Sequence, residues 1–176
     1  YDEYFCRKQS APRADLEPLL SSLGQIGLTE LNRNHASAGN LLRRLGATFR
    51  LNGAGLDGRE RILPFDPLPR LIHLNDWAKL ERGLLQRLEA IDRFLADVYG
   101  PQRILKDRVI PGEDVESSQG WRPQMQDIQL PLNRWCHISG LDLIRDEEGT
   151  WRVLEDNLRC PSGVAYFLEN RRVMKR

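Results

Sequence analysis

Oxygen-bearing side chains gather near the C-terminal end of the sequence. Asp142 lies in one apolar segment, and Glu155 and Asn157 end the next one. A turn at 146–149 would fold these segments into a hairpin, and alternation along a strand would give Glu155 and Asn157 one face while Asp156 points away. With Asp142 on the same face, two carboxylates and one amide oxygen converge. This set predicts a Mg²⁺ site, because proteins hold Mg²⁺ through a few oxygens completed by water and phosphate.

The residues that follow this group suit an anion. Arg159 offers a planar fork for phosphate or carboxylate. Pro161-Ser162-Gly163 is a loop of small residues before an expected helix, where backbone N–H groups can meet an anion. Two simpler interpretations stay open. The acidic side chains are merely solvated, or Arg159 forms a surface ion pair with Asp156.

Other reactive or aromatic residues give weaker signals. His137 is interpreted as a structural donor to a backbone carbonyl. Cys136 and Cys160 have no histidine partner at a readable spacing, so nucleophilic catalysis is not predicted. Arg70 is interpreted as a surface residue. The four tryptophans are too scattered along the chain to predict a stacking platform, and they stand at Trp77, Trp121, Trp135 and Trp151.

The composition excludes several classes of protein. The 176 residues include 26 Lys and Arg against 25 Asp and Glu, a net charge of +1, which gives no basic surface for nucleic acid. Hydrophobic residues make up 40%, enough for a folded core. No apolar stretch approaches the roughly 20 residues of a membrane span. Three cysteines without CxxC spacing indicate a reducing, cytoplasmic environment.

Helical periodicity dominates the first part of the chain. Leucines recur at helical spacing up to Gly24, and Thr29 is the expected N-cap of a second helix that ends at Gly46. The period then changes to that of short strands. The expected elements are an extended arm, two helices, a strand, a glycine-rich turn and a second strand, at 1–13, 15–24, 29–46, 48–51, 52–58 and 61–63.

The longest expected helix begins at a cap, Asn75 or Asp76, and ends before Gly100-Pro101. Its apolar stripe is expected to be core and comprises Leu80, Leu84, Leu88, Ile91, Leu95 and Val98. After a mixed segment at 102–133, the expected elements are strands at 135–138, 141–144 and 151–154 and a helix from Val164. The sequence therefore predicts an α+β fold, with a helical and β region at 1–133 and the hairpin region at 134–176.

The chain resembles the circularly permuted ATP-grasp family, whose members are similar to glutathionylspermidine synthetase. The residues that carry the resemblance are Tyr1-Asp2-Glu3, Pro64-Phe65-Asp66, Pro69-Arg70, Trp77, Glu81-Arg82-Gly83-Leu84, Phe94-Leu95, Asp97-Val98-Tyr99-Gly100, His137-Ile138, Gly140, Asp142, Leu154-Glu155-Asp156-Asn157-Leu158-Arg159, Pro161-Ser162-Gly163-Val164 and Leu168-Glu169-Asn170-Arg171-Arg172. The resemblance implies that the hairpin is the metal-binding part of such a fold.

The resemblance also implies an activity. ATP would phosphorylate a carboxylate, and an amine of a small molecule or peptide would attack the acylphosphate. Asp142, Glu155 and Asn157 would hold Mg²⁺, and Arg159 would steady the phosphoryl group or the substrate carboxylate. The two rival interpretations are a non-catalytic interaction module of the same shape and a metal-dependent hydrolase that uses Asp142 and Glu155.

The sequence is expected to be a piece of a longer protein. It opens at Tyr1 without a methionine and stops within a charged, helix-like stretch. In the permuted family the nucleotide-clamping lysines follow the metal-binding end, whereas Lys175 is the only lysine after Lys106 here. The resemblance therefore implies that these 176 residues alone do not turn over ATP.

Overall fold

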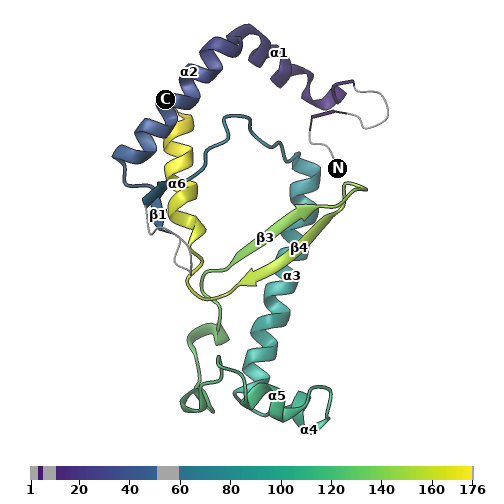
Figure 1. The fold of residues 1–176 in the computed structure, drawn as a ribbon. Coiled ribbons are helices and arrows are strands. Elements are labelled where there is room, and N and C mark those ends of the chain that lie inside the picture. Colours follow the sequence, from purple (N-terminus) through teal and green to yellow (C-terminus); the bar gives the residue numbers. More distant parts are fainter. Residues whose placement is uncertain (1–3, 6–10, 51–59, 176) are drawn as a thin grey trace. The chain divides into compact units, whose positions relative to one another are not determined.

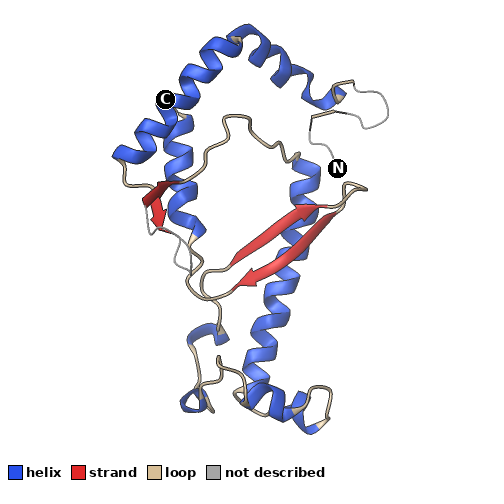
Figure 2. Ribbon diagram, viewed as in Figure 1, coloured by secondary structure: helices blue, strands red, loops and turns tan. Residues whose placement is uncertain are grey.

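The computed structural model in Figure 1 describes residues 4–5, 11–50 and 60–175. The chain divides into two compact units. The first consists of Tyr1–Leu71, Arg145–Thr150 and Pro161–Arg176, and the second of Ile72–Ile144 and Trp151–Cys160. Helices and small two-stranded sheets make up both, which confirms the predicted mixture of α and β structure (Figure 2). The sequence-based division into 1–133 and 134–176 stays a prediction.

The first unit is mainly helical. Its helices are the short 3-10 helix η1 (Ala14–Leu16), α1 (Glu17–Ile26), α2 (Leu28–Arg44) and α6 (Gly163–Met174). The break between α1 and α2 falls at Gly27, whose φ of 78° is accessible to glycine, and not at Gly24, which lies inside α1. Gly27 rather than Thr29 therefore precedes the second helix, and the predicted boundaries were wrong by about one turn.

The two short strands of the first unit confirm the predicted β pair. β1 (Thr48–Arg50) pairs antiparallel with β2 (Glu60–Ile62), with Thr48 opposite Ile62. The predicted turn at 52–58 and the Tyr1-Asp2-Glu3 motif lie outside the described residues. The core beside these strands is small, with Leu41, Leu45 and Phe65 packed against the buried residues Ala38, Leu42, Ala47 and Val173. The Tyr166 hydroxyl of α6 donates to the carbonyl of Thr48 (3.2 Å), so α6 is fastened to β1 as well.

The second unit is built along one long helix, α3 (Leu74–Val98). It ends where Gly100-Pro101 predicted, but it begins at Leu74 after His73, so neither Asn75 nor Asp76 is its N-cap. Leu80 and Val98 of the predicted stripe are buried, and the other four are half-buried. Short elements follow, namely α4 (Arg103–Lys106), α5 (Gly112–Glu116), η2 (Pro123–Met125) and η3 (Pro131–Asn133).

The predicted hairpin is present. β3 (Gly140–Arg145) and β4 (Trp151–Asn157) are neighbours in a two-stranded sheet, and their arrows run in opposite directions in Figure 2. The turn between them closes through a hydrogen bond from the N–H of Gly149 to the carbonyl of Asp146 (2.9 Å), with Gly149 at a φ of 83°. Within the described ranges, no helix has both the length and the apolar character needed to cross a membrane.

One predicted strand is absent. Residues 135–138 do not form a strand in the structure. The reason is that the backbone N–H groups of Trp135 and Cys136 both donate to the side chain of Asp92 on α3 (3.0 Å each). Donors used in this way are not available to a β ladder.

Candidate functional site

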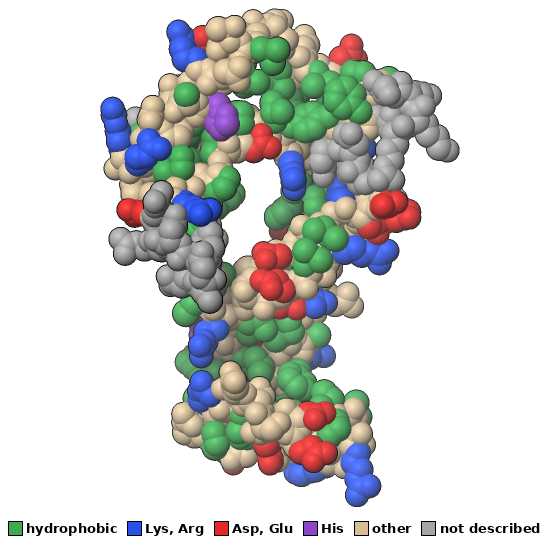
Figure 3. All heavy atoms as spheres, in the orientation of Figure 1, with side chains coloured by type: hydrophobic (Ala, Val, Ile, Leu, Met, Phe, Trp, Pro, Cys, Tyr) green, Lys and Arg blue, Asp and Glu red, His purple; other side chains and the backbone are tan. Residues whose placement is uncertain are grey.

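Glu155 and Asn157 form a contact at the end of β4. The amide Nδ2 of Asn157 donates to the carboxylate Oε1 of Glu155 (2.8 Å), so their side chains lie on the same side of the strand, as alternation predicted. This bond uses the nitrogen of the amide and one carboxylate oxygen. Asn157 Oδ1 and Glu155 Oε2 are therefore the atoms suited to face a cation. Figure 3 shows acidic side chains over the strands of this hairpin.

Asp156 turns the other way and binds α3. Its two carboxylate oxygens accept hydrogen bonds from Arg87 Nε (2.7 Å) and from a terminal guanidinium nitrogen of Arg87 (2.6 Å). These bonds lower the pKa of Asp156 despite partial burial, and they raise the pKa of Arg87. The proposed alternative of an Arg159–Asp156 ion pair is wrong, because Arg87 occupies both oxygens.

Asp142 lies on the neighbouring strand. It is exposed, as is Ile144, while the residues between and beside them are half-buried. In β4 the exposed residues are Arg152 and Leu154, and Glu155 is exposed as well, so the alternation of exposure ends at Glu155. That Asp142 joins the Glu155–Asn157 pair stays a prediction.

Arg159 follows β4 after one residue and is exposed. Cys160 comes next with a left-handed φ of 54°, so the chain bends sharply there before α6. The exposed guanidinium is open to a ligand, and its role in binding phosphate stays a prediction.

The candidate metal ligands fit a hard cation by their chemistry. All three offer oxygen, and Glu155 and Asp142 are exposed. Across the described part of the chain, no group of three or more His, Cys, Asp or Glu side chains is arranged to hold a metal. The set has only two carboxylates, so a bound Mg²⁺ would take its remaining ligands from water and phosphate, as Mg²⁺ commonly does.

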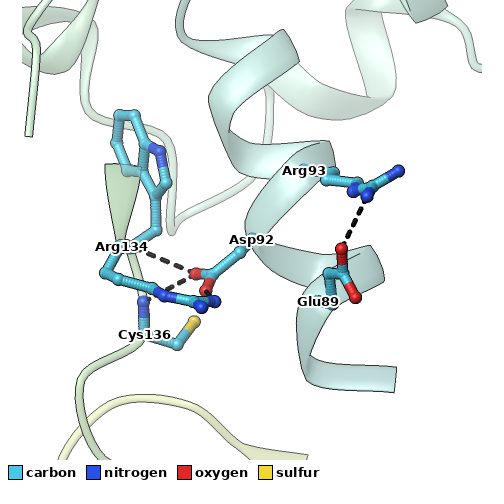
Figure 4. Close-up of polar contacts among 6 residues, drawn as sticks. Glu89, Asp92, Arg93, Arg134 and Cys136 are labelled. Atoms are coloured by element: carbon cyan, nitrogen blue, oxygen red, sulfur yellow. Dashed lines mark hydrogen bonds and ion pairs between the residues drawn. The ribbon is translucent and has the colours of Figure 1, made fainter. Parts of the chain in front are cut away.

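Sequence reasoning missed Asp92, the one buried charged residue among those described (6% exposed). Besides the N–H groups of Trp135 and Cys136, its carboxylate accepts a hydrogen bond from the guanidinium of Arg134 (3.0 Å) (Figure 4). Burial acts to raise the pKa of Asp92, but these bonds and the charge of Arg134 outweigh it, so the pKa is lowered. Asp92 thus ties the segment before β3 to α3. Its only signal in the sequence was a carboxylate beside the apolar stripe.

The same carboxylate affects a thiol. Burial, together with the negative charge of Asp92, raises the pKa of Cys136. A raised pKa keeps the thiol protonated and therefore poorly nucleophilic, in agreement with the interpretation that Cys136 is not a nucleophile.

An aromatic stack also escaped the sequence analysis. The ring of Tyr99 lies between Trp121 (centroids 4.7 Å apart, 5° between planes) and Trp135 (4.9 Å, 11°). The expectation that the tryptophans are too scattered to stack was therefore wrong for this pair. The 121–135 segment folds back onto the end of α3, which brings together residues far apart in sequence (Figure 1).

Comparison with known proteins decides the family. The model for circularly permuted ATP-grasp type 2 matches residues 69–176. The chain belongs to the circularly permuted ATP-grasp family. It is 47% identical over 175 residues to an uncharacterised protein from Synechocystis, covering 99% of this chain and 36% of that protein. It is 41% identical over 176 residues to an uncharacterised protein from Mycobacterium tuberculosis, covering all of this chain and 31% of that one.

A further relative in this ATP-grasp group has a name that states an activity. "Putative glutamate–cysteine ligase 2-3" from Frankia alni is 36% identical over 178 residues, which cover 98% of this chain and 20% of that protein. The chain thus spans about a third of the length of the first two relatives and a fifth of this one.

Proposed function

We propose that the full-length protein is an ATP-dependent carboxylate–amine ligase. The γ-phosphoryl group of ATP is transferred to a substrate carboxylate, and ADP leaves. The amine then attacks the acylphosphate, so that an amide bond forms and inorganic phosphate departs. Such transfer depends on positioning and charge neutralisation more than on covalent participation of the protein.

The observation that carries this proposal is the Glu155–Asn157 contact on β4 of an ATP-grasp chain. A carboxylate and an amide held side by side at the end of a strand offer two oxygens to one cation. Glu155, Asn157 and Asp142 are proposed to hold Mg²⁺. The ion, when bound, supplies charge neutralisation on the transferring phosphoryl group.

Arg159 is proposed to bind the transferred phosphoryl group or the substrate carboxylate. Its position supports this role, because it is exposed and only two residues beyond Asn157. A guanidinium fork makes two parallel hydrogen bonds to such an anion. The remaining groups that clamp ATP are proposed to lie in the part of the full-length protein that these 176 residues do not span.

The substrates are proposed to be small molecules or peptides, and the reaction is proposed to take place in the cytoplasm. The name of the Frankia relative suggests L-glutamate and L-cysteine as the first pair to test. The near-neutral charge supports no role in binding nucleic acid.

The test is ADP formation by the full-length protein with ATP and Mg²⁺, in the presence of the carboxylate alone, the amine alone, or both. We expect product only with both substrates, and Glu155→Gln to abolish it. The matched control is Glu148→Gln, the same substitution at the turn of the hairpin. ADP formation without an amine would favour the hydrolase, and a folded protein without ATP turnover on any pair of a broad amino-acid panel would favour the interaction module.

A further inference from the structure

A cavity of about 500 Å³ lies at the C-terminal end of α3, within the second unit. Ala96 and Tyr99 of the last helical turn form one wall, and the 127–133 loop with Trp135 forms the other. Asp156 is bound to α3 at Arg87, nine residues before Ala96, which is about 14 Å along the helix axis. The cavity is therefore separate from the Glu155–Asn157 pair.

The walls of this cavity are held in place by several bonds. The N–H of Asp127 donates to the carbonyl of Tyr99 (2.7 Å), which ties the loop to the helix end. Trp135 is fixed twice, by stacking on Tyr99 and by the bond from its backbone N–H to Asp92. A cavity whose walls are already ordered loses little entropy when a ligand binds.

The loop also stores backbone strain. Asp127, Leu132 and Asn133 have φ values of 58°, 56° and 51°, in the left-handed region that side chains such as leucine rarely adopt. Such conformations persist only where the surrounding structure imposes them, and they are frequent at ligand clamps.

Polar groups of the cavity are left without partners. The indole Nε1 of Trp135 is buried and has no hydrogen-bond acceptor in the described part of the chain. The side chains of Asp127, Gln129 and Asn133 line the cavity and make no hydrogen bond or ion pair with another described residue. A buried donor without an acceptor is costly, so a ligand that accepts from Trp135 gains affinity.

The charge of the cavity favours a cation. Asp127 is the one charged residue among those that line it. The C-terminal end of α3 adds the negative end of the helix dipole. One ammonium group already uses this region, because Lys106 Nζ donates to the carbonyl of Pro101 (2.7 Å).

We propose that this cavity binds a protonated primary amine that also carries a neutral hydrogen-bond acceptor, such as an amide carbonyl. The ammonium group pairs with Asp127 and with the amide oxygens of Gln129 and Asn133. The neutral acceptor takes the N–H of Trp135. A carboxylate in the acceptor's place is disfavoured by Asp127 and the helix end. This site does not depend on the proposed ligase activity.

The experiment is calorimetric titration of the full-length protein with three probes. L-leucinamide has both the ammonium and the amide, N-acetyl-L-leucinamide lacks the charge, and L-leucine has a carboxylate instead of the neutral acceptor. We expect saturable binding of L-leucinamide and at least about tenfold weaker binding of the other two. Absence of saturable L-leucinamide binding, or equal affinity for its acetylated form, overturns the proposal.

Variants locate the site. Asp127→Asn keeps the size of the side chain and tolerates the left-handed backbone, and it should weaken L-leucinamide binding about tenfold. Trp135→Phe removes only the N–H and should weaken binding severalfold. Asp114→Asn, at an exposed carboxylate on α5, is the control and should change nothing. Near-ultraviolet circular dichroism reports whether the aromatic stack is intact, and unchanged affinity in Asp127→Asn places the amine elsewhere.

Discussion

Arg87 and Asp156, 69 residues apart in sequence, are joined by two parallel hydrogen bonds of 2.7 and 2.6 Å. This fork fixes β4 against the middle of α3. Because side chains alternate along the strand, holding Asp156 toward the helix also sets the orientation of Glu155 and Asn157, which contact each other. The ion pair is therefore a positioning device for the candidate metal ligands, although it contains none of them.

Replacing the fork by a point charge tests this role. Arg87→Lys keeps the positive charge but cannot make two parallel bonds. We expect the melting temperature to fall by a few degrees and the apparent affinity for Mg²⁺ in the ligase assay to weaken, because β4 is held less firmly. Arg93→Lys, in an exposed pair with Glu89 on the same helix, is the matched control and should alter neither. Equal Mg²⁺ affinity in both variants would remove the positioning role.

Asp92 should be the most sensitive acidic residue of the second unit. Asp92→Ala leaves two backbone N–H groups without an acceptor and Arg134 without its partner, so we expect a loss of about 3 kcal/mol in the free energy of unfolding. Glu89→Ala, one turn earlier in an exposed pair with Arg93 (Figure 4), should cost less than about 0.5 kcal/mol. Chemical denaturation of both variants measures the difference, and similar losses would contradict the role assigned to Asp92.

The same carboxylates give the stability a pH dependence. The pKa values of Asp92 and Asp156 lie below the ordinary value of 3.8 in the folded chain. A carboxyl group with a depressed folded pKa contributes stability above its unfolded pKa and loses that contribution as pH falls through the folded value. We expect melting temperatures to be steady above about pH 5 and to fall below pH 4. The fall should be shallower in Asp92→Asn, and an identical fall would show that Asp92 is not responsible.

The fold was predictable where local signals are strong. The hairpin at 140–157 follows from alternating apolar residues and a glycine turn, and the end of α3 follows from Gly100-Pro101. Residues 135–138 were predicted as a strand because their composition suits one. The structure differs because Asp92, 43 residues earlier, binds the backbone of Trp135, and a long-range contact of this kind leaves no periodic signal.

The candidate site was predictable in part for the same reason. Spacing in β4 correctly placed Glu155 and Asn157 together, since period-two alternation is local. Spacing did not reveal that Arg87 takes Asp156, nor that Trp121 and Trp135 meet at Tyr99. These contacts depend on how segments from distant parts of the chain fold back onto α3.

Residues 1–176 expressed alone should not turn over ATP. The chain spans about a third of the first two relatives, and the clamp for the nucleotide is proposed to lie in the rest of the protein. Release of ADP from ATP and Mg²⁺ by this fragment, beside the full-length protein, is the measurement. Robust Mg²⁺-dependent turnover by the fragment would mean that the nucleotide site lies within these residues.

Substitutions at the candidate metal ligands should act on catalysis more than on folding. Glu155→Gln removes a charge that a hard divalent cation needs, whereas Asn157→Ala removes a neutral ligand. In the full-length enzyme we expect both to lower turnover at least about a hundredfold, with Glu155→Gln the more severe, and to leave melting temperatures within a few degrees. Turnover against Mg²⁺ concentration is the measurement, with Glu148→Gln as control. Asp156→Ala is not a suitable control, because it breaks the fork to Arg87.

Asp142 and Arg159 are separated by their responses to Mg²⁺. If Asp142 is a ligand, Asp142→Asn raises the Mg²⁺ concentration needed for half-maximal turnover, because the cation loses a charged oxygen. Arg159→Lys should leave that concentration unchanged and lower turnover, because an ammonium group cannot bind the phosphoryl group through two parallel bonds. Unchanged Mg²⁺ dependence in Asp142→Asn would exclude Asp142 from the metal site and leave Glu155 and Asn157 as its ligands. Full activity in Arg159→Lys would assign the exposed guanidinium to solvent.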